Sequence, residues 1–202
     1  MPAHIIPIVE GHGDVAAVPL LIRRIASALG VFDVRVGKPI RSPRQRLVKP
    51  GELERAVKLA SRKVAGNGQI LILIDAEDDC PRDLAPELAV RARTGVTVPV
   101  AVVLAKREYE AWFLGSLPSL HTALGLTGPI PAVVDPESIR GAKERFAALM
   151  GIHYSETLDQ PSLTTQFDMT ESRQRCPSFD KCWRAIEELI GTEQAGRADV
   201  VL

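Results

Sequence analysis

Three short apolar runs constrain the fold of this chain more strongly than any other feature of its sequence. They cover residues 4–9, 70–74 and 96–105, and each consists mainly of Val, Ile, Leu or Ala. Runs that are apolar at nearly every position, rather than at alternate positions, are typical of strands buried on both faces. Because helical segments follow the runs, the sequence predicts an α/β fold: a mostly parallel sheet of about four strands with helices on both faces.

The segments between the apolar runs have the character of amphipathic helices. We expect these helices at residues 14–29, 52–64 and 84–93. Pro19 lies within the first segment, so the regular helix is expected to begin only at that residue. Residues 31–36 mix apolar with charged side chains and predict a further strand nearer the edge of the sheet.

The rest of the chain consists of a long loop and a helical tail. Residues 37–50 contain three prolines and five basic residues, and a loop of this length in a compact domain is usually functional or mobile. The candidate helices of the tail are residues 139–150, 163–175 and 179–190. We therefore expect an α/β core at residues 1–116 and a helical C-terminal extension at residues 117–202, packed together as one structural unit.

The composition excludes several classes of protein. The 25 Lys and Arg residues balance the 25 Asp and Glu residues, which argues against binding nucleic acid through overall charge alone. Three cysteines without a CxxC pair and four scattered histidines predict free thiols, with neither a disulfide framework nor a zinc site. Without an apolar stretch of membrane-spanning length or a signal-peptide pattern, we expect a cytoplasmic protein that does not contact a membrane.

Charge is nevertheless distributed unevenly along the chain. Residues 35–63 contain ten Lys or Arg and two Glu, whereas residues 75–87 contain six acids and one Arg. The basic side chains of the long loop are candidates for contacts with the phosphate groups of nucleic acid. These candidates are Lys38, Arg41, Arg44, Arg46 and Lys49. The alternative interpretation of the basic segment is an ordinary solvated face.

Carboxylates follow each of the three apolar runs. The acids are Glu10 and Asp14 after the first run, Asp75, Glu77, Asp78 and Asp79 after the second, and Glu108 and Glu110 after the third. Loops at the carboxyl ends of neighbouring parallel strands converge, so these acids are expected to cluster. Clustered carboxylates repel one another, and a divalent cation removes that cost. Oxygen ligands without His or Cys favour Mg²⁺ or Mn²⁺ over zinc.

Other interpretations use the same residues. Asp14 is a residue type that favours a helix start, and the other acids could belong to ordinary solvated loops. Residues 11–16 also fit the dinucleotide-binding pattern G-x-G-x-x-G/A, with Asp33 about twenty residues further on. Pyrophosphate at a helix start needs positive potential, which Glu10 and Asp14 would oppose. Dinucleotide binding is therefore a distant alternative, and we expect His12 to face solvent.

Three blocks of the sequence resemble the TOPRIM domain superfamily. They are "IVEGHGD" at residues 8–14, "ILILIDAEDD" at residues 70–79 and "KREYEAWFL" at residues 106–114. Within that superfamily, the chain resembles small stand-alone bacterial proteins related to the nuclease domain of overcoming-lysogenization-defect (OLD) nucleases. The resemblance implies a four-stranded parallel core and a Mg²⁺-dependent site that acts on phosphodiesters.

The resemblance also implies roles for individual residues. Glu10 matches a family Glu that binds metal or acts as a general acid or base. Asp75 matches the first Asp of a D-x-D motif, but Glu77 stands at the second position, so Asp78 or Asp79 could replace it as a ligand. The implied metal ligands are Glu10, Asp14, Asp75, Glu77, Asp78 and Glu110, and the implied catalytic residues are Glu10, Asp75 and Lys106.

Two hypotheses for the function follow. The first is a nuclease that uses Mg²⁺ or Mn²⁺, with two ions at the site, and for which DNA is favoured over RNA as the substrate. The resemblance adds a separate ATPase as a partner in a bacterial defence or repair system. The second hypothesis is a non-catalytic TOPRIM-like module whose helical tail binds a partner. The large apolar residues of the tail could form a homodimer face, but we interpret them as core: Phe167, Phe179, Trp183, Ile186 and Ile190.

Overall fold

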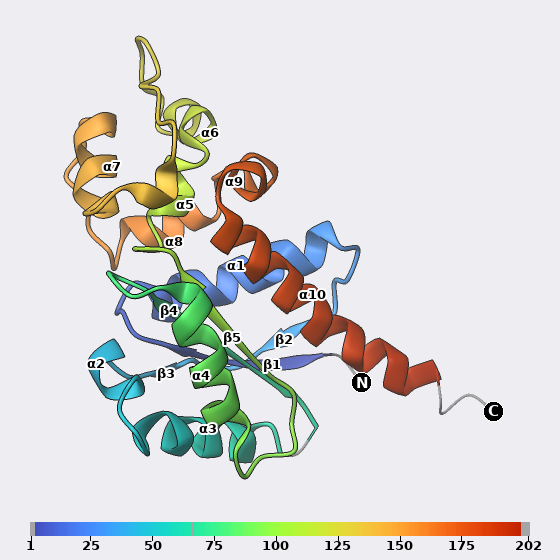
Figure 1. Cartoon of the computed structure of the whole chain (residues 1–202). Coiled ribbons are helices and arrows are strands. Elements are labelled where there is room, and N and C mark those ends of the chain that lie inside the picture. Colours follow the sequence, from blue (N-terminus) through green and yellow to red (C-terminus); the bar gives the residue numbers. More distant parts are fainter. Residues whose placement is uncertain (1–2, 66, 199–202) are drawn as a thin grey trace.

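A computed structural model describes residues 3–65 and 67–198, which contain one five-stranded sheet (Figure 1). The strands are β1 (His4–Val9), β2 (Arg35–Val36), β3 (Ile40–Arg41), β4 (Gln69–Asp75) and β5 (Val100–Ala105). Their order is β2-β1-β4-β5, and β3 pairs with β1 nearer the carboxyl end of β1. All of these pairings are parallel, which confirms the predicted α/β fold.

The side chains of the central strand divide between the two faces of the sheet. In β4, Leu71 and Leu73 join the hydrophobic core on one face, whereas Ile70, Ile72 and Ile74 join the core on the other. All five are almost completely buried, because β1 and β5 flank the strand and helices cover both faces. The uninterrupted apolar run therefore reflects the central position of β4.

Helices cover both faces of the sheet (Figure 1). α1 (Asp14–Ala28) and α10 (Pro177–Ala198) pack on one face. α3 (Glu52–Lys63), α4 (Pro81–Arg93) and the short α2 (Arg44–Leu47) lie on the other. None of the helices in the described ranges is long and apolar enough to cross a membrane.

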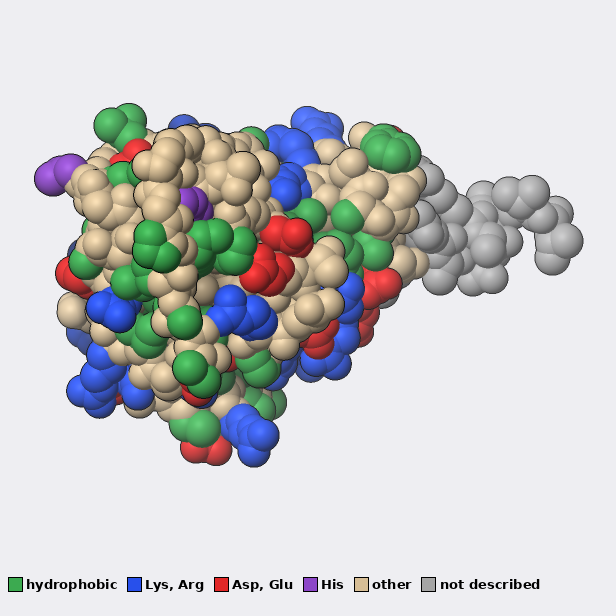
Figure 2. All heavy atoms as spheres, turned by 90° about the horizontal axis from the view of Figure 1, so that it is seen from above, with side chains coloured by type: hydrophobic (Ala, Val, Ile, Leu, Met, Phe, Trp, Pro, Cys, Tyr) green, Lys and Arg blue, Asp and Glu red, His purple; other side chains and the backbone are tan. Residues whose placement is uncertain are grey.

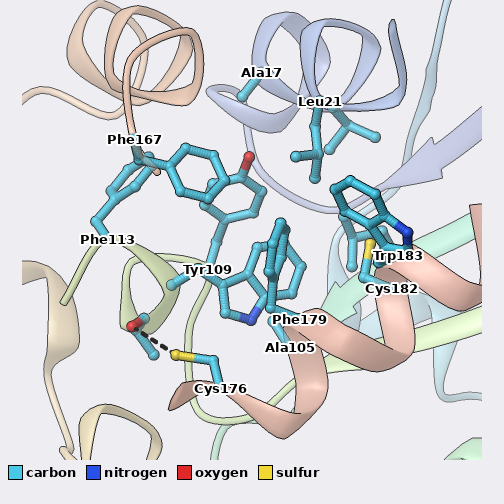
Figure 3. Close-up of a cluster of buried hydrophobic side chains, with 14 of the residues drawn as sticks. Ala17, Leu21, Ala105, Tyr109, Phe113, Phe167, Cys176, Phe179, Cys182 and Trp183 are labelled. Atoms are coloured by element: carbon cyan, nitrogen blue, oxygen red, sulfur yellow. Dashed lines mark hydrogen bonds between the residues drawn. The ribbon is translucent and has the colours of Figure 1, made fainter. Parts of the chain in front are cut away.

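The helices that follow β5 share one hydrophobic cluster with the sheet. They are α5 (Ala111–Leu114), α6 (Leu117–Ala123), α7 (Ala142–Met150), α8 (Asp159–Thr164) and α9 (Met169–Arg175). The 3-10 helix η1 (Pro136–Ser138) lies against α5. Figure 3 shows the aromatic part of this cluster, in which the rings of Phe167 and Phe179 lie 5.4 Å apart. The structure confirms as core the large apolar residues of the tail: Phe167, Phe179, Trp183, Ile186 and Ile190.

The basic segment differs from the loop that the sequence predicts. Residues 37–50 contain β3 and α2, because Ile40 pairs with Ile8 of β1 and the Leu47 side chain is fully buried. The preceding strand is shorter than expected, since only Arg35–Val36 of residues 31–36 pairs with β1. β2 is thus one of the four strands expected, whereas β3 is a fifth strand on the same side of β1.

Helix boundaries also differ from the expectation, most clearly at α1 and at residues 163–175. α1 begins at Asp14 rather than at Pro19, because the Gly13 carbonyl already accepts the Ala17 N–H at 2.9 Å. Residues 163–175 do not form one helix but are divided between α8 and α9. The division occurs at Asp168, whose side chain caps α9 by accepting the backbone N–H of Thr170 at 2.7 Å.

One face of the molecule carries charges of both signs. Figure 2 views the protein from above the orientation of Figure 1, and Lys and Arg side chains on that face lie in separate groups among acidic and apolar ones. This mixture agrees with a formal net charge of zero. Any basic surface that binds a polyanion must therefore be a small patch rather than a whole face of the molecule.

Candidate functional site

An acidic pocket lies at the carboxyl ends of β1 and β4. Its volume is about 360 Å³, and its walls come from the sheet, from α2 and from the segment that leads into α8. We call it the acid pocket and define it by its carboxylates, which are Glu10, Asp14, Asp75, Glu77, Glu110 and Glu156. The expected convergence of acids from the ends of three strands is therefore observed for Glu10, Asp75 and Glu110.

The sheet itself places Glu10 beside Asp75. The parallel register sets Val9 next to Leu73, so the carboxylate of Glu10 reaches Asp75, the last residue of β4, and accepts its N–H at 3.1 Å. Burial raises the pKa of Glu10 to about 7, and repulsion from Asp14 adds to the rise. Burial and the negative charge of Glu10 also raise the pKa of Asp75 well above its ordinary value.

Asp14 is held in place by hydrogen bonds on both of its carboxylate oxygens. Its Oδ2 accepts the Gly11 N–H at 2.8 Å, and its Oδ1 accepts the side-chain amide of Gln160 at 2.9 Å. The residue is only 8% exposed, and this burial raises its pKa. Asp14 thus joins the start of α1 to α8 of the C-terminal extension.

Glu110 forms the wall of the pocket next to β5. It is 5% exposed and directly precedes α5. The Tyr154 hydroxyl donates a hydrogen bond to its Oε1 at 2.7 Å. Burial raises the pKa of Glu110 to about 7, although the hydrogen bond from Tyr154 lowers it in part.

The extension closes the pocket through Glu156 and Gln160, two residues that the sequence did not single out. A Cβ atom on Gly13 would lie 2.0 Å from the Gln160 Oε1 atom and 2.4 Å from the Glu156 carbonyl oxygen. Gly13 is therefore needed for the close approach of the two segments. Glu156 in turn accepts the Lys143 ammonium at 2.6 Å. Residues 154–160 do not come directly after a strand, so the rule that acids at strand ends cluster could not identify them.

Arg44 is the cation that lines the acid pocket. Its Nε donates to the Asp75 carbonyl at 2.8 Å, and a guanidinium nitrogen donates to the Ala76 carbonyl at 3.2 Å. It also pairs with Glu77 at 3.5 Å and with Asp79. Only 11% of its side chain is exposed, so two main-chain carbonyls fix the guanidinium at the end of β4.

The acids that follow β4 point in different directions. Glu77 has a left-handed backbone conformation, with φ of +50°, and lines the acid pocket. Asp78 lies outside the pocket lining and pairs with Arg107 and, at 2.9 Å, with Arg140. Among the sequence candidates, Glu77 is therefore better placed than Asp78 or Asp79 to face a ligand in the pocket.

Several basic candidates also lie outside the pocket lining. The Lys106 backbone N–H donates to the Ser178 hydroxyl at 3.1 Å, and the residue does not line the pocket. Arg41 reaches the backbone carbonyl of Glu10 at 3.4 Å. The other basic candidates of the segment are exposed and lie outside the lining; they are Lys38, Arg46 and Lys49.

The start of α1 is already occupied by protein groups. Asp14 accepts the Gly11 N–H, and residues 156–160 lie against Gly13. A pyrophosphate bound as in dinucleotide-binding proteins needs those N–H groups and that space. The geometry therefore argues against the dinucleotide alternative. His12 is exposed, as expected.

The carboxylates share a pocket without forming a preassembled metal centre. Within residues 3–65 and 67–198, no group of three or more His, Cys, Asp or Glu side chains is arranged to hold a metal ion. Glu10, Asp14 and Glu110 accept hydrogen bonds from protein donors, whereas no described residue donates one to the carboxylate of Asp75. The donor set consists of oxygen atoms, which suits a hard cation such as Mg²⁺ or Mn²⁺.

Comparison with protein families gives one match. Residues 9–187 match the family described as a domain of unknown function (DUF4276). The match includes every carboxylate of the acid pocket and most of the C-terminal extension. No curated protein and no solved structure is significantly similar to the chain.

Proposed function

The chain belongs to the DUF4276 family, and from the acid pocket we propose that it is a Mg²⁺- or Mn²⁺-dependent phosphodiester hydrolase that acts on nucleic acid. The observation that carries this proposal is the meeting of Glu10, Asp75 and Glu110 in one pocket. Glu10 and Glu110 follow β1 and β5, Asp75 ends β4, and all three have raised pKa values. A fold gains nothing from burying several like charges together, so such a cluster favours a ligand that neutralises them.

The carboxylates divide into those suited to a cation and those already engaged. The carboxylate of Asp75 accepts no hydrogen bond from the described residues, and among these residues Glu10 has a donor on Oε1 alone, so these two are the proposed principal ligands. Asp14, Glu77 and Glu110 would complete one or two cation sites around them. A bound divalent ion would polarise the phosphodiester and lower the pKa of an attacking water molecule.

Arg44 is the proposed partner of the substrate phosphate. Its guanidinium is fixed by the carbonyls of Asp75 and Ala76, so it needs little reordering when an anion enters. Guanidinium groups bind phosphate oxygens through two parallel hydrogen bonds. An anionic phosphate would compete with Glu77 and Asp79 for this group.

The resemblance of residues 8–14, 70–79 and 106–114 to TOPRIM domains gives this proposal its second support. In the nucleases that the chain resembles, acids after the same strands bind metal. That resemblance extends the proposal to a defence or repair system of bacteria, with a separate ATPase as a partner. Lys106 receives no role in the proposal, because it does not line the pocket.

A non-catalytic interaction module is the alternative function. The observation that favours it is the absence of a preassembled metal group among the described residues, together with the ion pairs that Arg44 makes with Glu77 and Asp79. Such a module would use the pocket acids to hold a basic group of a partner protein. Titration calorimetry with Mn²⁺ separates the two functions, because only the hydrolase needs to bind the ion.

The test of the hydrolase is cleavage of plasmid DNA in the presence of Mn²⁺ or Mg²⁺. We expect Glu10→Gln and Asp75→Asn each to reduce the rate about 100-fold or more, because each removes a ligand that acts on the transition state. The matched controls are Glu187→Gln and Asp83→Asn, which remove exposed carboxylates outside the pocket and should retain full activity. Equal activity of the pocket variants and the wild type would contradict the proposal.

A further inference from the structure

A second hollow lies beside the acid pocket, against the outer face of α3. Its volume is about 420 Å³, and we call it the α3 groove. Its lining residues are Ser42, Glu52, Arg55, Ala56, Lys58, Leu59 and Arg62. Only a short stretch of chain separates the two hollows: Ser42 lines the α3 groove, whereas the next two residues, Pro43 and Arg44, line the acid pocket.

The cations of the α3 groove are largely uncompensated. Arg55, Lys58 and Arg62 are three and four positions apart, which places them on one face of the helix, and all three are exposed. Arg55 pairs with Glu52 at 2.9 Å. Lys58 and Arg62 form no ion pair with any carboxylate in the described part of the chain. Glu52 thus compensates Arg55, whereas the positive charges of Lys58 and Arg62 are not neutralised by any carboxylate of the described residues.

We propose that the α3 groove binds the phosphate backbone of a DNA strand next to the phosphodiester that enters the acid pocket. The identity of this ligand rests on the proposed function, and the inference narrows the substrate to a polynucleotide rather than a mononucleotide. Evenly spaced phosphates on one chain can occupy two adjacent hollows at once. Leu59, which is 45% exposed, supplies apolar surface against which a sugar can pack.

The shape and surroundings of the groove favour a nucleic acid over other anions. A membrane presents its charge on a broad surface, whereas these cations line a hollow beside a wall of carboxylates. An acidic peptide carries no group that the acid pocket would process under the proposed function. Phosphate contacts of this kind position a nucleic acid without reading its sequence, so binding should show no strong sequence preference.

The test is binding of the full-length protein to a fluorescein-labelled DNA duplex, measured by fluorescence anisotropy over a range of KCl concentrations. Ca²⁺ replaces Mg²⁺ so that binding is read without relying on cleavage. The test variant is Lys58→Gln with Arg62→Gln. The control is Arg23→Gln with Lys181→Gln, which removes the same charge from exposed positions on α1 and α10 across the sheet.

We expect the Lys58→Gln/Arg62→Gln protein to bind DNA more weakly and to lower the slope of log K against log salt by about 2, since each phosphate contact contributes about 0.9. The control should bind like the wild type. Both proteins should unfold at the wild-type temperature, because all the replaced side chains are exposed.

An unchanged salt slope in the test variant, or an equal loss in the control, would overturn the inference. So would a wild-type protein that binds phosphatidylserine vesicles or polyglutamate but not DNA. The proposed function fails on a different result, which is unimpaired cleavage by Glu10→Gln and Asp75→Asn. A protein that binds DNA through the α3 groove but never cleaves it would support the proposed DNA-binding groove and contradict the proposed hydrolase activity.

Discussion

The two walls of the acid pocket are built by different means. On one wall, Glu10 and Asp75 stand at the ends of paired strands, so the backbone register alone brings them together. On the other wall, Glu156 and Gln160 belong to the C-terminal extension, and they reach the pocket only because helices pack and because Gly13 leaves room. The sheet wall is thus a local consequence of strand pairing, whereas the extension wall depends on the whole hydrophobic core.

Among the substitutions that probe the two walls, Phe179→Ala should lower the free energy of unfolding the most. Phe179 is fully buried, with its ring 5.1 Å from that of Trp112 and 5.4 Å from that of Phe167. Truncation of a buried Phe costs about 3–5 kcal/mol of the free energy of unfolding. The hydrophobic cluster also contains Leu71 and Leu73 of the sheet, so we expect the extension and the sheet to unfold in one transition.

The measurement is urea unfolding followed by tryptophan fluorescence and by far-ultraviolet circular dichroism. Ile72→Ala is the control, because it truncates the core on the opposite face of the sheet. Both variants should shift both signals together. Two separate transitions in the Phe179→Ala protein would show that the extension wall is an independent unit.

Glu110→Gln should stabilise the metal-free protein at alkaline pH. Its pKa of about 7 lies above the ordinary value of 4.5, so the folded state keeps a proton that the unfolded state releases as the pH rises between these values. The wild type therefore loses stability over that range, by about 3 kcal/mol at most for this residue, and glutamine avoids the loss. Below pH 4 the two proteins should be equally stable.

Urea unfolding in EDTA from pH 4 to pH 8 tests this expectation. Addition of Mn²⁺ at pH 8 should stabilise the wild type more than Glu110→Gln, because the cation replaces the missing proton. Glu187→Gln serves as the control, since it removes an exposed carboxylate outside the acid pocket. If the difference in the free energy of unfolding between wild type and Glu110→Gln is the same at pH 4 and pH 8, the raised pKa assigned to Glu110 is contradicted.

Gly13→Ala should lower the free energy of unfolding by about 1–3 kcal/mol, the usual cost of overpacking, because it crowds the extension wall. The added methyl group meets the Glu156 carbonyl oxygen, which is backbone and cannot turn aside as a side chain can. Gly191→Ala is the matched control, because its added methyl group in α10 meets no described atom within 4 Å apart from its own helix backbone and chain neighbours. The control should raise the free energy of unfolding by up to about 1 kcal/mol, because Ala has a higher helix propensity than Gly. A Gly13→Ala protein as stable as the wild type would show that residues 156–160 do not need this close approach.

The difference between the sheet wall and the extension wall also explains which features could be predicted from the sequence. Glu10, Asp75 and Glu110 were expected to meet because apolar runs identify buried strands, and parallel strands align their carboxyl ends. The position of Glu77 relative to Asp78 depends on a turn with positive φ, which the sequence does not indicate without a glycine. β3 was missed because two residues of pairing leave no periodicity to detect.

Tyr154→Phe should produce the smallest effect, about 1 kcal/mol, the usual net value of one hydrogen bond. The Tyr154 hydroxyl donates to Glu110 at 2.7 Å, and burial raises the pKa of Tyr154, so the phenol remains a donor throughout the accessible pH range. Loss of this donor should raise the pKa of Glu110 further, because the hydrogen bond lowers it in the wild type. The stability difference between wild type and Tyr154→Phe should therefore grow as the pH rises.

A double-mutant cycle at pH 8 separates this electrostatic role from simple packing. In the Glu110→Gln background, the hydroxyl meets a neutral oxygen, so Tyr154→Phe should cost less than in the wild type and lose its pH dependence. A packing role would give the same cost in both backgrounds, because Phe retains the ring that stands 5.9 Å from the ring of Phe146. Coupling between Tyr154 and Glu110 would mean that the extension tunes an acid placed by the sheet side of the pocket, so the two walls act as one site.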